Sequence, residues 1–268
     1  LLRVHIFLEH SNLPLRKEQC LYYIYCFEPL MILILLGKEQ VMKFIHPVLL
    51  SFYIIAMIFA DSSWAKNLTS EFDKKHKLCL EQISKEASMA FERAMIWQDE
   101  GGGRRAKHCV AMSLFALGHE VEAAARLDAL AIASDGGTNA MRANFYSEAA
   151  NFWLIGGHPE NAYSSASKGL ELVNGSVPLF ITRARSYFAL KRYGDAIMDL
   201  DSALINEPEN ADALRYRANV NLKQGNFNAA KKDINKSLQI NPNSIESALV
   251  RGQINESLRL VGSYKKDS

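Results

Sequence analysis

The 268-residue chain lacks an excess of either charge, because 31 basic and 29 acidic residues leave a formal net charge of +2. Without a basic surplus there is no electrostatic reason to expect a nucleic-acid partner. The chain also lacks a nucleophile elbow, a His-Glu-x-x-His motif and paired carboxylates in a loop-rich context. We therefore expect neither an enzyme nor a bound cofactor or metal.

Long apolar runs are missing after residue 65, whereas residues 1–65 carry two apolar stretches and few charges. From Met42 the sequence has the three parts of a secretory signal: Lys43, an apolar region over 48–60, and small residues before a cleavage after Ala65. The apolar region is short for a membrane span. We expect 42–65 to be the signal peptide of a bacterial protein that is periplasmic or secreted.

An uncleaved anchor in the inner membrane is the alternative, and the other apolar stretch, at 30–36, favours it. Residues 1–41 contain no Ala, Thr or Asp, although Ala is the commonest residue later. We expect this segment to be upstream sequence from a start assigned too early. A membrane-inserting extension is the alternative.

The region after the signal repeats at a fixed distance. Residues 222–243 align without gaps on residues 188–209, which lie 34 positions earlier, and residues 154–175 continue the register. The matched positions include Ala196 and Ala230, Asp199 and Asp233, Leu204 and Leu238, and Pro208 and Pro242. A period of 34 residues is that of the tetratricopeptide repeat, and the chain resembles that family.

The resemblance implies repeated pairs of antiparallel helices, A and B, which pack closely through small residues such as Ala184, Ala196 and Ala203. We expect an all-α fold, an α–α superhelix with a capping C-terminal helix. The repeats cover 104–244, with units at 104–137, 143–176, 177–210 and 211–244 and an insertion at 138–142. Residues 66–103 form a degenerate helical segment with a poor first helix, and 245–268 hold the capping helix, to about residue 261, and a polar tail.

Two arginine–aspartate pairs recur in register, Arg183 with Asp199 and Arg217 with Asp233, each sixteen residues apart. Because the acid recurs together with the base, we interpret them as structural ion pairs between the two helices of a repeat. Arginines that bind a partner are the alternative.

In this family the concave face is lined mainly by helix A, at its second, fifth, ninth and twelfth places. The resemblance gives seven candidate partner-binding residues: Asn151, Leu154, Arg185, Phe188, Arg215, Asn219 and Leu222. Arginine and aromatic side chains are common anchors of interfaces, and asparagine can bond a peptide backbone. An ordinary solvated face is the alternative for any one of them. The carboxylate clamp of one subgroup is not reproduced, because Glu148, Thr182 and Tyr216 occupy the sixth places.

Two cysteines remain after removal of the signal, Cys79 and Cys109, in a compartment expected to be oxidising. With the register set by Ala87, they lie on neighbouring helices with an offset of about six residues, or roughly 9 Å. That exceeds the Cα separation of a disulfide. The glycines at 101–103 could shift the register, so the disulfide stays open. A metal site with His76 and His108 is a weaker alternative, because adjacent residues of a helix point about 100° apart.

These features predict a non-enzymatic scaffold in the bacterial envelope that binds a protein or peptide in a concave groove. The alternative is a membrane-anchored subunit of an envelope assembly or secretion complex. The sequence leaves the identity of the partner and the oligomeric state open.

Overall fold

The computed structural model describes residues 69–267. The predicted upstream segment 1–41 and the signal peptide 42–65 lie outside the described residues. Within residues 69–267 every regular element is a helix, and strands are absent. None of these helices combines the length and the hydropathy needed to cross a membrane.

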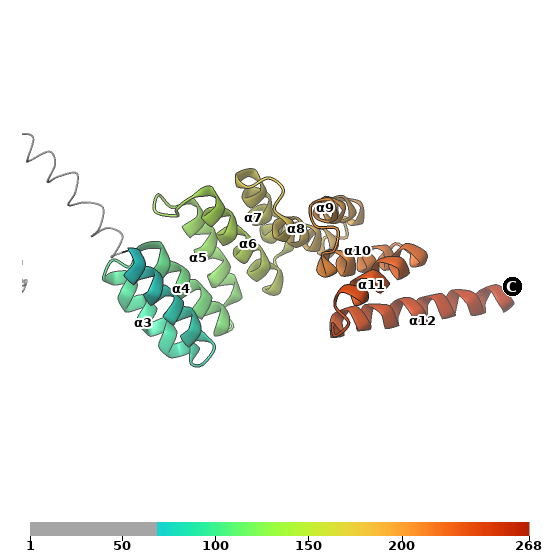
Figure 1. Ribbon diagram of the computed structural model, residues 1–268, viewed down its shortest axis with the longest axis horizontal. Helices are drawn as coiled ribbons and strands as arrows, with labels where there is room; N and C mark the ends of the chain where they lie inside the picture. Colours follow the sequence, from blue (N-terminus) through green and yellow to red (C-terminus); the bar gives the residue numbers. More distant parts are fainter. Residues whose placement is uncertain (1–68, 268) are drawn as a thin grey trace, which may run out of the picture. The chain divides into compact units, whose positions relative to one another are not determined.

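The described helices follow one another through short turns (Figure 1). Residues 69–83 form the first of them. It is followed by α3 (Ala87–Asp99), α4 (Gly103–Ala116), α5 (Glu120–Ile132), α6 (Asn139–Ile155), α7 (Pro159–Leu172), α8 (Val177–Ala189), α9 (Tyr193–Asn206), α10 (Ala211–Lys223), α11 (Phe227–Ile240) and α12 (Ile245–Asp267). Residues 139–142 of the expected insertion form the first turn of α6, and Thr138 caps that helix by accepting a hydrogen bond from the Met141 N–H at 3.3 Å.

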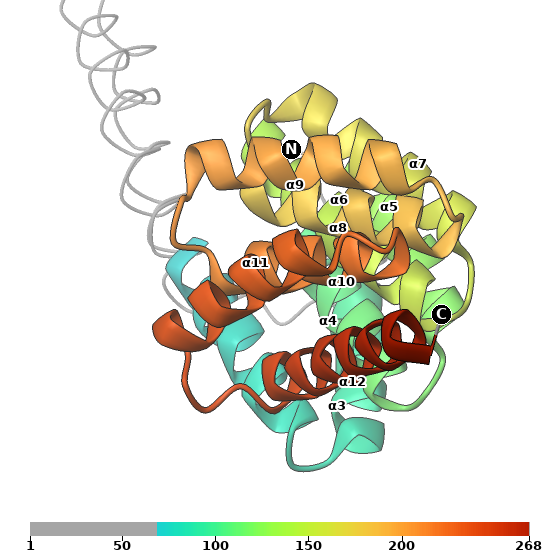
Figure 2. The same ribbon diagram turned by 90° about the vertical axis from the view of Figure 1, so that its right-hand side faces the viewer.

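Each helix packs on its neighbours in the chain, and alternate helices also touch. Helix α6 contacts α8, α8 contacts α10, and α10 contacts α12. These helices are the A helices of successive repeats, and they form one layer of an all-α superhelix (Figures 1 and 2). A groove on this layer is therefore built from equivalent positions of successive repeats.

Small residues allow the helices to approach closely, as the sequence predicts. Ala184, Ala196 and Ala203 are each at most 1% exposed and belong to one apolar cluster of α8, α9 and α10. At the contact between α7 and α8, a Cβ atom added to Gly169 would lie 2.8 Å from the Leu179 side chain. The core is thus a chain of contacts between neighbours and not one central cluster.

The C-terminal helix covers the last apolar face of the superhelix. Val250 and Ile254 of α12 pack in one cluster with Ala218, Ala230 and Ile234 of the repeat before it. We expected the helix to end near residue 261, but α12 continues to Asp267. The helix passes through Gly262, because a single glycine lowers helix propensity but removes no backbone hydrogen bond.

The turn inside each repeat ends helix A with one residue in the left-handed region. Three repeats use glycine there, Gly118, Gly157 and Gly225, whereas the unit 177–210 uses Lys191 with φ 60°. The following N–H bonds back to a carbonyl five residues earlier in each case, as from Arg192 to Tyr187 at 2.8 Å. The geometry of the turn is therefore the same, and only Lys191 adopts it against the preference of its Cβ atom.

We predict that Lys191→Gly raises the free energy of unfolding by about 1 kcal/mol, because glycine adopts this conformation without steric cost. Gly225→Ala is the matched reverse change. No atom lies within 4 Å of the added Cβ, so any loss reports conformation alone. Urea denaturation followed by circular dichroism measures both. A Lys191→Gly protein less stable than the parent would contradict the prediction.

Candidate functional site

A cavity of about 230 Å³ opens on the layer of A helices, between α6, α8 and α10. Its lining combines Leu154 from α6, Arg185 and Phe188 from α8, and Tyr216 and Asn219 from α10. Ala184, Leu200 and Val220 complete the wall. Four of the seven predicted partner-binding residues therefore meet in one cavity, which we call the groove cavity.

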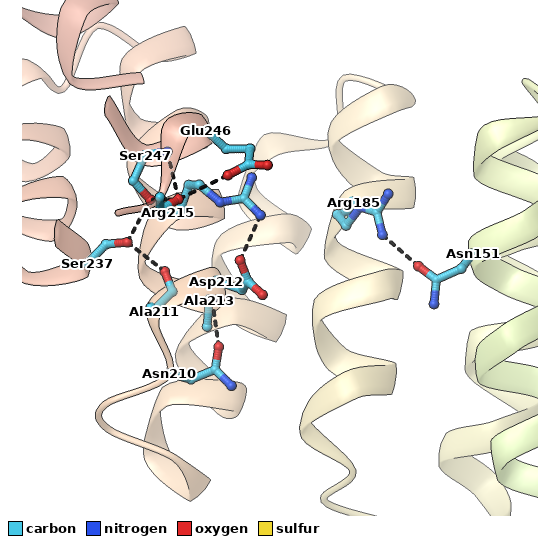
Figure 3. Close-up of polar contacts among 11 residues, drawn as sticks. Asn151, Arg185, Asn210, Ala211, Asp212, Ala213, Arg215, Ser237, Glu246 and Ser247 are labelled. Carbon is cyan, nitrogen blue, oxygen red and sulfur yellow. Dashed lines mark hydrogen bonds and ion pairs between the residues drawn. The ribbon is translucent and has the colours of Figure 1, made fainter. Parts of the chain in front are cut away.

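The charged side chain of the groove cavity, Arg185, is held by its neighbours. Arg185 donates a hydrogen bond from Nη1 to Oδ1 of Asn151 at 2.6 Å, and it points toward that residue across the gap between α8 and α6 (Figure 3). On the other side, the guanidinium carbon of Arg185 lies 5.3 Å from the ring centre of Tyr216. The cation is thereby fixed at the mouth of an apolar cavity, where it can meet a negative or polar group.

Arg215 flanks the groove cavity and does not line it. Its guanidinium carbon lies 4.1 Å from the ring centre of Tyr216, so the ring contacts both arginines. Arg215 also donates to Asp212 at 2.8 Å, one helical turn away (Figure 3). Its positive charge is thus partly balanced within its own helix.

Leu222 and Tyr216 show where the sequence reasoning was incomplete. Leu222 is partly buried and packs against the C-terminal cluster of α10, α11 and α12, so it does not line the groove cavity. Tyr216 lines it but was not among the candidates. Its place was the signal that could have identified it, because Tyr216 occupies a sixth place, which one subgroup of the family uses to bind a partner.

The two repeated ion pairs lie between the helices of their repeats. Arg183 donates two hydrogen bonds to Asp199, both at 2.7 Å, and Arg217 does the same to Asp233. Arg217 donates a further bond to Asp201 of the preceding repeat at 2.7 Å, which the sequence did not reveal. The two carboxylates are almost completely buried, and each arginine joins the two helices of its repeat.

The two cysteines form a disulfide between the helix 69–83 and α4, with a Cα–Cα distance of 6.4 Å. The expected offset of about six residues was wrong. His76 contacts His108 and Asp73 contacts Arg105, both 32 residues apart, while the cysteines are 30 apart, which gives an offset of 32 − 30 = 2 residues. Residues 69–83 thus pair with α4 in a shorter register than the 34-residue period predicts.

The histidines beside the disulfide bond to protein groups. His76 Nε2 lies 2.9 Å from His108 Nδ1, and His108 Nε2 lies 2.8 Å from a carboxylate oxygen of Glu148 on α6. This polar chain links three neighbouring helices. Among the described residues, no group of three or more His, Cys, Asp or Glu side chains is arranged to hold a metal ion.

The surroundings of His76 disfavour its protonation. Burial, the adjacent His108 and the positive charge of Arg105 lower the pKa of His76 from 6.5 to about 4, although Asp73 and Glu148 act in the opposite direction. In the unfolded chain the same imidazole takes up a proton near its ordinary pKa. Protonation therefore favours the unfolded state between these two pH values.

We predict that the docked state of the helix 69–83 loses stability as the pH drops from about 6.5 to about 4, because only the unfolded chain binds a proton at His76 in that window. His76→Asn should flatten this dependence. Hydrogen exchange of the helix 69–83, measured at both pH values, provides the test, and His158→Asn is a control at a histidine near a turn. Equal pH dependence of the parent and His76→Asn proteins would refute the assignment.

Comparison with known proteins agrees with this architecture. Residues 211–244, which form α10 and α11, match the sequence model of the tetratricopeptide repeat. The chain is 28% identical over 118 residues to human Tetratricopeptide repeat protein 12, and the match covers 44% of this chain and 16% of that protein. The chain thus spans only a small part of the length of that relative.

Two solved structures of this kind are similar to parts of the chain. TTC0263, a thermophilic tetratricopeptide-repeat protein of Thermus thermophilus, has a TM-score of 0.51 at 18% identity, over 68% of this chain and 98% of its own. The first such domain of Spaghetti (RPAP3), bound to an HSP90 peptide, has a TM-score of 0.43 at 24% identity, over 46% of this chain and 97% of its own. The fold defines the class as a tetratricopeptide-repeat superhelix. Within it, residues 211–244 carry the family's repeat.

Proposed function

We propose that this protein is a non-enzymatic scaffold that binds a protein or peptide segment in the groove cavity. The observation that carries the proposal is the cavity itself, where Leu154 and Phe188 provide apolar walls and Arg185 and Asn219 provide polar groups. A site of this kind takes an apolar side chain while polar groups bond the backbone around it. Its lining comes from three repeats, so an extended segment would contact several of them.

The proposal also rests on two side chains, Arg185 and Phe188, that are held in place while Arg185 keeps donors for a partner. Arg185 makes one hydrogen bond, to Asn151, and the guanidinium group carries five N–H donors in total. Its fixed position reduces the entropy that binding would otherwise cost. Phe188 is half-buried next to Tyr193, with 5.7 Å between ring centres, so its ring is held in place before a partner arrives.

We predict that Phe188→Ala lowers the affinity for a captured peptide by about tenfold or more, and that the double charge reversal Arg185→Glu, Arg215→Glu does the same. Phe188→Ala removes the apolar wall, and the reversals replace attraction by repulsion at the mouth of the cavity. The peptide is selected from a random library displayed against the full chain, and its affinity is measured by calorimetry.

Two exposed positions that do not line the groove cavity serve as matched controls. Ile205→Ala removes an apolar side chain that is 80% exposed, and Arg259→Glu reverses an exposed charge on α12. Both should leave the affinity unchanged. If the groove variants bound the selected peptide as tightly as these controls do, the groove cavity would not be the binding site.

We further propose that the protein is exported to the bacterial envelope. The signal-like sequence at 42–65 and the disulfide between Cys79 and Cys109 support this, because disulfides persist mainly in oxidising compartments. An uncleaved N-terminal segment would instead make the protein a membrane-anchored subunit of an envelope complex.

The intact mass of the protein from its native host distinguishes these two forms. For the exported form we expect a chain that begins at Lys66 and is two hydrogens lighter than the reduced chain, because the two thiols are joined. A chain that retains Met42 and fractionates with membranes would support the anchored form. A chain that retains Met42, carries free thiols and fractionates with the cytosol would overturn the export proposal.

A further inference from the structure

The disulfide places its two sulfur atoms in different surroundings. Cys109 is completely buried in the apolar cluster that joins α3 to α8. Cys79 is only partly buried, and it lines a cavity of about 170 Å³ between the helix 69–83 and α3. Cys109 is not among the lining residues, so a reagent that enters this cavity reaches Cys79 and not Cys109.

The same cavity carries two positive charges. Lys75 and Arg93 line it together with Gln82 and the apolar Leu78, Ala94 and Trp97, and none of these lining residues is acidic. Arg93 donates to the neutral side chain of Gln82 at 2.9 Å. Lys75 lies 5.0 Å from the ring centre of Trp97, and its ion pair with Glu100 is long, at 3.7 Å, and exposed. The cavity therefore attracts small anions.

We propose that Cys79 is a thiol–disulfide exchange site that takes a small anionic thiol, such as a cysteine-containing peptide that carries carboxylates. The thiolate attacks the sulfur of Cys79 and forms a new disulfide with it, and the bond between Cys79 and Cys109 breaks. The electron pair remains on Cys109, which leaves as a thiolate and takes a proton from water. No net oxidation or reduction occurs in this step.

Exchange at Cys79 would free the helix 69–83 from its covalent bond to α4. Polar ties to α4 would remain, namely the contact of His76 with His108 and the ion pair of Asp73 with Arg105. A Cys109 thiolate is disfavoured in apolar surroundings, so the mixed disulfide persists only once this sulfur has taken a proton, which requires the helix 69–83 to move and admit water for that step. The thiol state of the surroundings would thereby control the docking of this helix.

This site is separate from the groove cavity, and its test uses no partner of the groove. The oxidised full chain is treated with glutathione, which is anionic, or with cysteamine, which is cationic. Rates are compared at equal thiolate concentration, since thiols of different pKa react differently. After quenching with an alkylating agent, peptide mass spectrometry locates the added thiol. We expect it on Cys79, with the alkyl group on Cys109.

The charges of the cavity should set the choice between the two thiols. We expect glutathione to react about threefold or more faster than cysteamine in low salt, and the difference to shrink in high salt. Lys75→Gln combined with Arg93→Gln should remove this preference. Lys77→Gln is the matched control, because Lys77 lies on the same helix but does not line the cavity. The salt series on the parent chain tests the idea even if the double variant folds poorly.

Three results would overturn the proposal. One is the added thiol on Cys109, and another is an equal rate for both thiols in the parent chain. The third is a rate that does not depend on thiol concentration, since exchange would then wait for global unfolding and the cavity would have no part in it.

Discussion

The structure depends on one constraint: a pair of helices cannot bury its apolar face alone, so each repeat is stable only through contact with its neighbours. The buried alanines 184, 196 and 203 satisfy it within one unit, because small side chains let helices approach closely. Where α7 meets α8, Gly169 has the same role. The repeats between continue these contacts, and the two ends of the described region, where the contacts stop, are stabilised by α12 and by the disulfide of the helix 69–83.

The groove cavity is a consequence of the same packing. Because α6, α8 and α10 follow one another at a period of 34 residues, Leu154, Phe188 and Leu222 occupy equivalent places. The first two line the cavity, whereas Leu222 packs against the apolar cluster that α12 completes. The last repeat thus contributes Tyr216 and Asn219 to the groove cavity but not Leu222. A partner in this cavity would contact three successive repeats, the last of them through α10.

The period was sufficient to predict the helical pairs, because the positions that must be small or bulky recur with it. It also indicated the pairs Arg183–Asp199 and Arg217–Asp233, since a base and an acid in the same register need the same geometry. It could not reveal the bond from Arg217 to Asp201, which depends on the angle between two repeats. Tyr216 was missed for a related reason: its contacts with two arginines come from two helices.

The ends of the array departed most from the sequence prediction. At the N-terminal end, residues of the helix 69–83 contact residues of α4 that lie 32 positions later in the sequence. This register brings the two cysteines within bonding distance. The sequence could not specify this register, because the effect of the three glycines at 101–103 depends on their backbone angles. Gly101 and Gly103 have positive φ angles, and Gly102 packs so closely on the Trp97 side chain that an added Cβ atom would clash with it.

The two ends are stabilised in different ways because they bury different amounts of apolar surface. At the C-terminal end, α12 buries Val250 and Ile254 and needs no covalent bond. At the N-terminal end, the helix 69–83 offers mainly polar side chains, and an imidazole chain, an ion pair and a disulfide hold it. Hydrophobic contacts respond weakly to pH and thiols, whereas these ties respond to both. We therefore expect the helix 69–83 to be the part of the superhelix whose docking depends most on pH and thiols.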